Sequence, residues 1–292
     1  MNTLNIIGCG RLGQTLAKLW AQHNVFTIQD IMNRSRASAA AAVAFIGAGH
    51  AVADAAELRP ADLFLIATPD DAIATCAHRL AQTGCLQVGN IVFHCSGALP
   101  STDLHRVTEY GAFTASVHPV KSFATPERAV QSFAGTYCGV EGDPQALAVL
   151  QSAFTRIGGK LFAIDPTKKT FYHAAAVLVC NNLTALIELG ARLYEKAGLS
   201  RETAFDVMRP IVRETVEAAF SLGTARALTG PLARGDHATV GKHLDALHAS
   251  DPQIEAAYRA LGVIAIDLAR TQGIAAASAL DHLQKLLSRN AS

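Results

Sequence analysis

Short apolar runs alternate with amphipathic stretches along the chain up to about residue 165. The runs have the length of buried strands, and the stretches between them repeat their apolar residues at helical spacing. This alternation predicts a mostly parallel sheet with helices packed against it. The expected strands are Leu4–Ile7, Ile28–Met32, Leu63–Ala67, Ile91–His94, Ala112–Val117, Thr136–Val140 and Leu161–Ile164, with helices over Leu12–Gln22, Asp71–Gln82 and Pro144–Ile157.

The pattern changes after Asp165-Pro166, where strand-like runs cease and helical spacing continues to the end of the chain. Helices are expected over Thr167–Lys196, Ser200–Leu222, 237–249, 252–272 and 276–289. We therefore expect an α/β domain over residues 1–165 and an all-α domain over 166–292. No low-complexity segment separates them, which predicts a rigid junction.

Composition narrows the class of protein. Of the 292 residues, 50% are hydrophobic and 17% charged, enough apolar material for a large core. The formal net charge is +1, so the chain lacks the basic excess typical of nucleic-acid binding. The unbroken apolar stretch Ala174–Cys180 is shorter than the roughly 20 residues of a membrane span. We expect no nucleic-acid or membrane partner.

The six cysteines form no C-x-x-C pair and no Cys/His cluster at zinc spacing, so no metal site is expected. Several lie in apolar runs, where a free cysteine behaves as a small buried hydrophobe. The N-terminus runs directly into a strand without a basic leader. A reduced, cytoplasmic setting is the expectation.

A glycine-rich segment follows the first expected strand and opens the first expected helix. It matches G-x-G-x-x-G, in which the glycines permit a tight turn, close approach of the backbone to a pyrophosphate, and close packing of helix on strand. The helix N-terminus then points its N–H groups at the phosphates. The segment predicts dinucleotide binding through Gly8, Cys9, Gly10, Arg11, Leu12 and Gly13.

The end of the second expected strand bears on which cofactor binds. An acid about 20 residues after the glycines binds the ribose 2′-hydroxyl of NAD, whereas an arginine accommodates the 2′-phosphate of NADP. Here the tip reads Asn33-Arg34-Ser35, and Asp30 lies inside the strand. This favours NADP(H), held by Asn33, Arg34 and Ser35, over the alternative that Arg34 is a solvated surface residue.

The expected strand Leu63–Ala67 is followed by Thr68-Pro69-Asp70-Asp71. Loops at the carboxyl ends of parallel strands border the ligand crevice, so Thr68 and Pro69 are further cofactor-binding candidates. Capping of the next helix by Asp70 is an alternative that is compatible with this role.

These motifs, taken together and in order, resemble bacterial proteins that pair a Rossmann-like NADP-binding domain with a helical C-terminal domain of unknown function. The layout is similar to pyrroline-5-carboxylate reductases, ketopantoate reductases and 6-phosphogluconate-type β-hydroxyacid dehydrogenases. The resemblance implies a doubly wound Rossmann sheet, a second domain like the 6-phosphogluconate dehydrogenase C-terminal one, a homodimer, and a substrate pocket between domains. It rests on Gly8–Gly13, Asn33-Arg34-Ser35, Thr68–Asp71, His94-Cys95-Ser96-Gly97, His118-Pro119, Tyr172-His173-Ala174-Ala175, Asn181-Asn182 and Thr229–Asp236.

By that resemblance the long helix after Pro166 supplies the proton donor. Lys169 and His173 are spaced i, i+4 and share a helix face, whereas Asn181 lies about 12 Å further along. β-Hydroxyacid dehydrogenases have Lys then Asn at i, i+4, and here His173 stands in place of the Asn. His173 is the preferred acid, with a core histidine as its alternative. Lys169 is either catalytic or a solvated cation at the helix start.

Further candidates come from strand ends and from the C-terminal part. Ser96 and His118 follow strands at the ligand edge and are expected to orient the substrate, although Ser96-Gly97 also reads as a simple turn. By resemblance to the glycine-rich loop of pyrroline-5-carboxylate reductases, Thr229 and Arg234 bind a substrate carboxylate across a dimer. Gly235 and Asp236 also read as a helix C-cap followed by an N-cap.

The sequence thus favours an NADP(H)-dependent oxidoreductase that reduces a small carbonyl or imine. The alternative is a non-catalytic protein that senses NADP(H) or presents it to a partner, since the Lys-x-x-x-Asn pair is missing.

Overall fold

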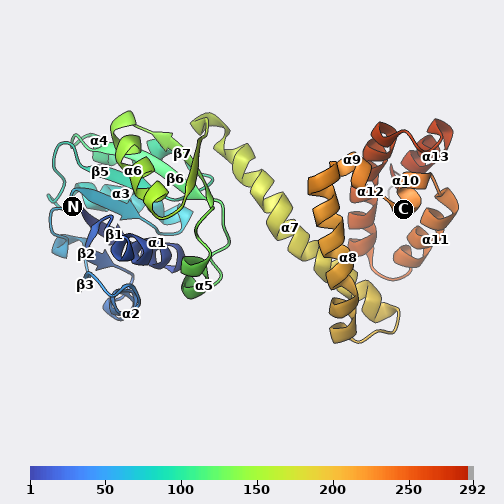
Figure 1. Cartoon of the computed structure of the whole chain (residues 1–292), viewed down its shortest axis with the longest axis horizontal. Helices are drawn as coiled ribbons and strands as arrows, with labels where there is room; N and C mark the ends of the chain where they lie inside the picture. Colours follow the sequence, from blue (N-terminus) through green and yellow to red (C-terminus); the bar gives the residue numbers. More distant parts are fainter. Residues whose placement is uncertain (289–292) are drawn as a thin grey trace. The chain divides into compact units, whose positions relative to one another are not determined.

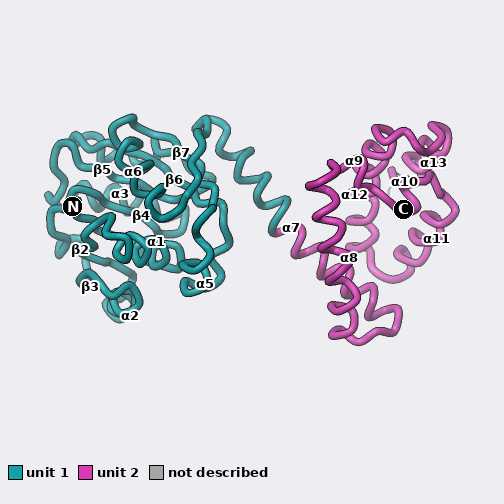
Figure 2. Tube along the Cα trace, viewed as in Figure 1, with its two compact units in different colours: residues 1–180 teal, residues 181–292 magenta. Residues whose placement is uncertain are grey.

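The computed structural model describes residues 1–288, and they form two compact units, 1–180 and the described part of 181–292 (Figure 2). The division falls inside the helix α7 (Lys169–Lys196). The change from strands to helices comes earlier, between the last strand and the short 3-10 turn Pro166–Lys168. Each unit is described by itself below.

The first unit is built on an eight-stranded sheet of order β3-β2-β1-β4-β5-β6-β7-β8 (Figure 1). All neighbouring strands are parallel except β6 and β7, which are antiparallel. The expected mostly parallel sheet is confirmed, and β3 is a strand that the pattern missed, because it has three residues and only one is buried. The strands are β1 (Thr3–Ile7), β2 (Thr27–Met32), β3 (His50–Val52), β4 (Leu63–Ile66), β5 (Ile91–His94), β6 (Phe113–Pro119), β7 (Tyr137–Gly142) and β8 (Lys160–Ala163).

Helices cover both faces of the sheet, because the central strands bury side chains on both sides. In β4, Leu63 and Leu65 join one apolar core and Phe64 and Ile66 join the other, as the period of two requires. The first core also holds the fully buried Trp20. The helices of this unit are α1 (Arg11–Gln22), α2 (Arg36–Ile46), α3 (Asp70–Ala81), α4 (His105–Thr108), α5 (Pro126–Gln131) and α6 (Pro144–Arg156).

The strand order reverses beside β1, with β2 on one side and β4 on the other. Strands β1, β4, β5 and β6 are mutually parallel, so their carboxyl ends share one edge of the sheet. Ligands of open α/β sheets bind at this edge, near the point where the order reverses. The fold therefore gathers the loops after these four strands in one place.

The second unit is entirely helical over its described residues. Its apolar core includes Val240, Leu244, Ile266, Leu280 and Leu283, contributed by three helices. All of the expected helices are present, and residue 289 of the last one lies outside the described part. Besides the rest of α7, the helices are α8 (Arg201–Leu222), α9 (Thr224–Ala227), α10 (Gly230–Arg234), α11 (His237–His248), α12 (Pro252–Gln272) and α13 (Ala277–Ser288).

The segment Pro166–Lys196, which contains α7, is long and apolar enough to cross a membrane by length and composition. Its most apolar window has a mean hydropathy of 1.6 and is only 6% buried. The expected helix Thr167–Lys196 is therefore present, but the expectation of no membrane span rested on unbroken apolar residues, and Asn181 and Asn182 interrupt the run in this helix. The exposed apolar side chains of α7 include Phe171, Leu178, Val179 and Leu186.

Candidate active site

The glycine-rich loop joins β1 to α1 at the carboxyl edge of the sheet. Gly8 has a φ of +82°, and a Cβ there would lie 2.4 Å from Cγ2 of Thr68. A Cβ on Gly10 would meet nothing within 4 Å, and α1 begins at the next residue without a side-chain cap. A Cβ on Gly13 would touch Ala67 of the sheet at 3.4 Å. The three glycines thus meet the three requirements of a pyrophosphate cradle, and the open helix N-terminus leaves its N–H groups for the phosphates.

The predicted cofactor residues at the end of β2 have different environments. Asn33 braces the loop, because its Oδ1 accepts a hydrogen bond of 2.6 Å from the Cys9 N–H. Ser35 is the N-cap of α2 and accepts from the Ser38 N–H. Arg34 between them is exposed. Ser35 is exposed as well, but its hydroxyl caps α2, so Arg34 is the charged side chain of this tip that is open to a ligand.

The competing acid Asp30 is 1% exposed and lies within β2. Its carboxylate accepts from the Arg59 N–H at 2.9 Å and from the Arg59 guanidinium, which raises the pKa of Arg59. Asp30 is committed to this internal ion pair, so it is not placed to bind a ribose hydroxyl.

The loop after β4 contacts the glycine-rich loop through Thr68 and the turn after β5 through Asp70. Thr68 packs on Gly8, and within residues 1–288 the only hydrogen-bonding group near its buried Oγ1 is the weakly polar Cys76 thiol. Pro69, rather than Asp70, holds the N-cap position of α3, so the expected capping by Asp70 is wrong. The Asp70 carboxylate instead accepts a 2.9 Å hydrogen bond from the Ser96 hydroxyl.

Ser96 forms the turn that the sequence suggested, and it also contacts the site. Its Oγ accepts from the N–H groups of Ala98 and Leu99 while donating to Asp70. The next residue, Gly97, is crowded on its Cα side, because a Cβ there would lie 2.8 Å from ring atoms of both His118 and His173. The turn after β5 therefore borders two histidines.

His118, Tyr172 and His173 form a cluster of aromatic polar side chains. His118 Nδ1 and the Tyr172 hydroxyl share a 2.8 Å hydrogen bond, and the ring centroids of His118 and His173 lie 6.2 Å apart. Burial, and then the nearby His173 and Lys169, lower the pKa of His118 to about 4, so its imidazole is neutral near pH 7. Burial raises the pKa of Tyr172 to about 12.

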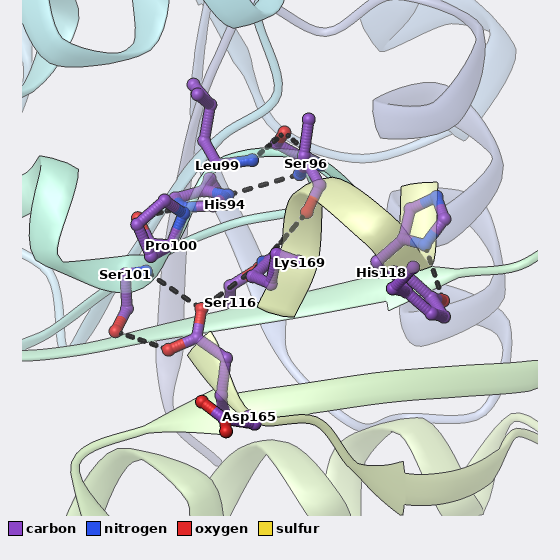
Figure 3. A network of polar contacts seen from close by, with 12 residues as sticks. His94, Ser96, Leu99, Pro100, Ser101, Ser116, His118, Asp165 and Lys169 are labelled. Carbon is purple, nitrogen blue, oxygen red and sulfur yellow. Dashed lines mark hydrogen bonds and ion pairs between the residues drawn. The ribbon is translucent and has the colours of Figure 1, made fainter. Parts of the chain in front are cut away.

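Lys169 is 1% exposed, which rules out the alternative of a solvated cation at the helix start. Its Nζ donates to the Ser96 carbonyl at 3.1 Å, to Ser116 Oγ at 2.5 Å and to Glu141 Oε1 at 3.2 Å (Figure 3). Burial lowers the pKa of Lys169, and the neighbouring Glu141 carboxylate opposes that shift. Three acceptors for three N–H bonds leave this ammonium saturated.

Glu141 is a site residue that the sequence analysis missed. It is 6% exposed, and besides Lys169 it accepts from the N–H and the hydroxyl of Ser101 at 2.8 and 2.7 Å. The available signal was a single acid directly after the expected strand Thr136–Val140, and the structure extends β7 to include it. A buried acid of this kind requires a partner, and the sequence alone does not say which lysine provides it.

His94 is fully buried beneath the site, between the backbone of Ser96 and that of Pro100 (Figure 3). Its Nδ1 accepts from the Ser96 N–H at 3.1 Å, so Nε2 carries the proton and donates to the Pro100 carbonyl at 3.2 Å. Burial, and then the Lys169 charge, lower its pKa to about 4. His94 is a neutral brace for the turn after β5.

The depressed pKa of His94 predicts a pH-dependent stability. The unfolded histidine titrates near 6.5 and the folded one near 4, so between these values the unfolded state binds the proton more tightly. The stability is present above pH 6.5 and is lost as the pH falls toward 4, by roughly 3 kcal/mol for this group. Denaturant unfolding across this range measures it. His94→Gln should flatten the curve, and an equal slope in both proteins would contradict the assignment.

The remaining predicted residues belong to the second unit. Asn181 is exposed on α7, Thr229 is the N-cap residue of α10, and Arg234 is exposed at the end of that helix. Gly235 is a left-handed C-cap, and Asp236 caps α11 through the Thr239 N–H, which confirms the capping interpretation of this segment. Among residues 1–288, no group of three or more His, Cys, Asp or Glu is arranged to hold a metal ion.

The fold and the site define a protein with a Rossmann-like sheet domain followed by a helical domain. Residues 2–119 match the Rossmann-like domain, and residues 136–265 match the domain of unknown function DUF2520. The chain therefore carries a Rossmann-like domain followed by a DUF2520 domain, which confirms the resemblance drawn from its motifs.

Solved structures agree with this assignment. A Bacteroides fragilis protein named as an NADP oxidoreductase is 26% identical, with a TM-score of 0.71 over 93% of this chain and 97% of its own. A Thermotoga maritima protein is also 26% identical, with a TM-score of 0.72 over 92% and 99%. Plasmodium falciparum pyrroline carboxylate reductase with NADP bound shares the fold at 14% identity, with a TM-score of 0.57 over 98% of both chains. The comparison with curated proteins gave no match.

Proposed function

We propose that this protein is an NADP(H)-dependent oxidoreductase that reduces a small carbonyl or imine compound. One observation carries the proposal: a continuous series of contacts runs from the phosphate loop to the histidine cluster. Gly8 packs on Thr68, Asp70 binds Ser96, and Gly97 lies against His118 and His173. A cofactor binding site and a set of proton-exchanging side chains therefore share one edge of the sheet.

The glycine-rich loop and Arg34 are the residues that would hold the cofactor. When bound, NADPH supplies a hydride for the carbon of a C=O or C=N bond, while the heteroatom takes up a proton. The resemblance to an NADP oxidoreductase at 26% identity supports the same cofactor.

Arg34→Ala tests the choice between the two nicotinamide cofactors. Because a guanidinium pairs with a phosphate dianion and Asp30 is already engaged, NADPH affinity is expected to fall about 10- to 100-fold. NADH affinity should change little. Fluorescence titration of both cofactors measures this, with Arg106→Ala, an exposed arginine paired to Glu109, as the control. Equal losses for NADPH and NADH would overturn the assignment.

The proton comes, in this proposal, from His173, with His118 orienting the acceptor. Ser96 contributes through the turn, because its buried hydroxyl is already engaged with Asp70 and with the N–H groups of Ala98 and Leu99. Tyr172 fixes the His118 ring through its hydroxyl. His118 is neutral near pH 7, so it orients the substrate by hydrogen bonding rather than by charge. Asn181, Thr229 and Arg234 stay candidates for substrate contacts made by the helical domain.

A panel of keto acids, cyclic imines and hydroxy acids, followed by the absorbance of NADPH, tests the function directly. Turnover of a member supports a reductase and names its substrate class. NADPH binding with no turnover across the panel would instead favour the alternative, a redox-sensing or partner-binding protein.

We further propose that the protein is a cytoplasmic homodimer in which a second copy covers the apolar side chains of α7. In support, Val179 of this helix is 68% exposed, and Leu178 beside it is 62% exposed. Contiguous exposed apolar residues of this kind are typical of interaction surfaces. Four of the six cysteines are buried, as suits a reducing compartment.

The oligomeric state has a matched test. Light scattering during size-exclusion chromatography should give the mass of a dimer. Val179→Asp should weaken dimerisation at least about tenfold, because it buries a charge in the interface. The control is Val88→Asp, at a valine that is 87% exposed in a loop. A monomer at all concentrations would contradict the proposal.

A further inference from the structure

The buried Lys169–Glu141 pair lies next to the histidine cluster, and the two share the first turn of α7. Lys169 is the first residue of that helix, and Tyr172 and His173 follow at i+3 and i+4 on the same face. Lys169 Nζ reaches three different segments of the sheet: the turn after β5 at Ser96, β6 at Ser116 and β7 at Glu141.

The antiparallel pair β6–β7 holds both the contacts of Lys169 and those of Tyr172, at two cross-strand positions that are neighbours on the same face of the sheet. Ser116 is opposite Glu141, and this position binds Lys169. Two residues further along β6, His118 is opposite Gly139, and this position receives Tyr172. A Cβ on Gly139 would collide with the side chain of Ile164 and lie 3.1 Å from the Tyr172 hydroxyl, so the glycine leaves room for both side chains.

We infer that Lys169 and Glu141 are positioning residues, a buried ion pair that fixes the first turn of α7 where Tyr172 and His173 meet His118. The inference rests on the proposed reductase function and deepens it. It assigns the positioning of the site to the Lys169–Glu141 pair and leaves proton donation to His173. Lys169 has its three N–H bonds committed inside the protein, and at 1% exposure it has no surface toward a substrate.

The Glu141 carboxylate, like the Lys169 ammonium, has its hydrogen bonds committed inside the protein. Glu141 accepts two hydrogen bonds from Ser101, in the 3-10 turn that follows the Ser96 turn. The pair therefore ties α7 to β6, β7 and the loop after β5, the elements that carry His118 and Gly97. Loss of one partner would leave a buried charge unpaired, and the first turn of α7 would shift to solvate it.

The test compares Lys169→Met with the double variant Lys169→Met/Glu141→Gln, which removes both charges and keeps hydrogen bonding to Ser101. The control is Lys168→Met, at the neighbouring lysine, whose side chain is 73% exposed. With turnover on a panel substrate, kcat should fall about 100-fold in both test variants, the scale of a roughly 1 Å misplacement. NADPH affinity should stay within about twofold, and the control should match the parent protein.

A double-mutant cycle of Lys169→Met with Tyr172→Phe distinguishes positioning from proton donation. If Lys169 acts through Tyr172, the two losses are non-additive. Additive losses, or a pH profile of kcat that loses a titration in Lys169→Met, would overturn the inference and make Lys169 the proton donor.

A second readout needs no turnover. The nitrogen NMR shifts of His118 report its hydrogen bond to Tyr172, and they should change in both test variants and not in Lys168→Met. Unchanged His118 shifts in the folded test variants would overturn the inference. If no panel substrate is reduced, the proposed function fails while this measurement still decides whether the ion pair positions the cluster.

Discussion

Gly10→Val is expected to lower NADPH affinity by roughly 100-fold or more while leaving the fold intact. Gly10 has an extended backbone with a φ of −79°, which any residue adopts, and a Cβ there meets no protein atom within 4 Å. A valine at this N-cap position of α1 loses only the modest capping preference of glycine, so the main cost falls on the ligand whose pyrophosphate approaches the backbone of the loop. Cofactor titration measures the NADPH affinity, and thermal unfolding of the apoprotein measures whether the fold keeps its stability.

Gly241→Val is the matched control, because Gly241 of α11 is also free of neighbours within 4 Å and has no positive φ. Its NADPH affinity should equal that of the parent protein. Gly8→Ala should behave differently from Gly10→Val, since its Cβ would collide with Thr68 and destabilise the apoprotein. Tight NADPH binding by Gly10→Val would contradict the cofactor site.

His173→Ala is expected to lower kcat at least tenfold, and within the 10²- to 10⁴-fold range typical of general acids if His173 alone gives the proton. The ring adjoins Gly97 opposite His118, and its removal takes the proposed donor from the cluster while sparing the Lys169–Glu141 pair. NADPH affinity should not change, because no contact of the phosphate loop involves this residue. Steady-state rates on a panel substrate and cofactor titration provide the measurements.

His105→Ala, at an exposed histidine of α4, is the control for the loss of an imidazole, and it should retain full activity. The companion variant Tyr172→Phe should cost less than His173→Ala, since it frees the His118 ring without removing the donor. A His173→Ala enzyme with unchanged kcat would remove His173 from the chemistry.

Periodicity predicted seven of the eight strands and most of the longer helices, because their apolar residues repeat at strand or helix spacing. Strand β5 has the bounds that its apolar run gave, and over the described residues the five helices expected after Pro166 begin and end within two residues of their expected limits. The short helices α9 and α10 were not expected, because four or five residues carry no helical period. Strand β3 was not predicted because its three residues are too few to show alternation of apolar and polar positions. Its conformation is determined by pairing with β2. The antiparallel direction of β7 also has no signature in a single run of residues.

The site was predicted less completely than the fold. The glycine loop and the strand-end residues Ser96 and His118 follow local rules that a sequence displays. Glu141 and the burial of Lys169 depend on a contact between residues 28 positions apart, and that contact exists only after α7 has packed on β7. Tyr172 belongs to one of the motifs that carry the resemblance, but its hydrogen bond to His118 exists only once α7 has packed beside β6.

The cross-strand alignment of β6 with β7 also determines where this protein tolerates changes in length. Because side chains alternate between faces, inserting one residue between Gly139 and Glu141 would send one of these positions to the opposite face of the sheet. The Glu141 side chain that binds Lys169 and the Gly139 position beside Tyr172 would then no longer lie on the same face of the sheet. Loops such as the one bearing Val88 have no such constraint, so natural length variation should accumulate there and be absent from β7.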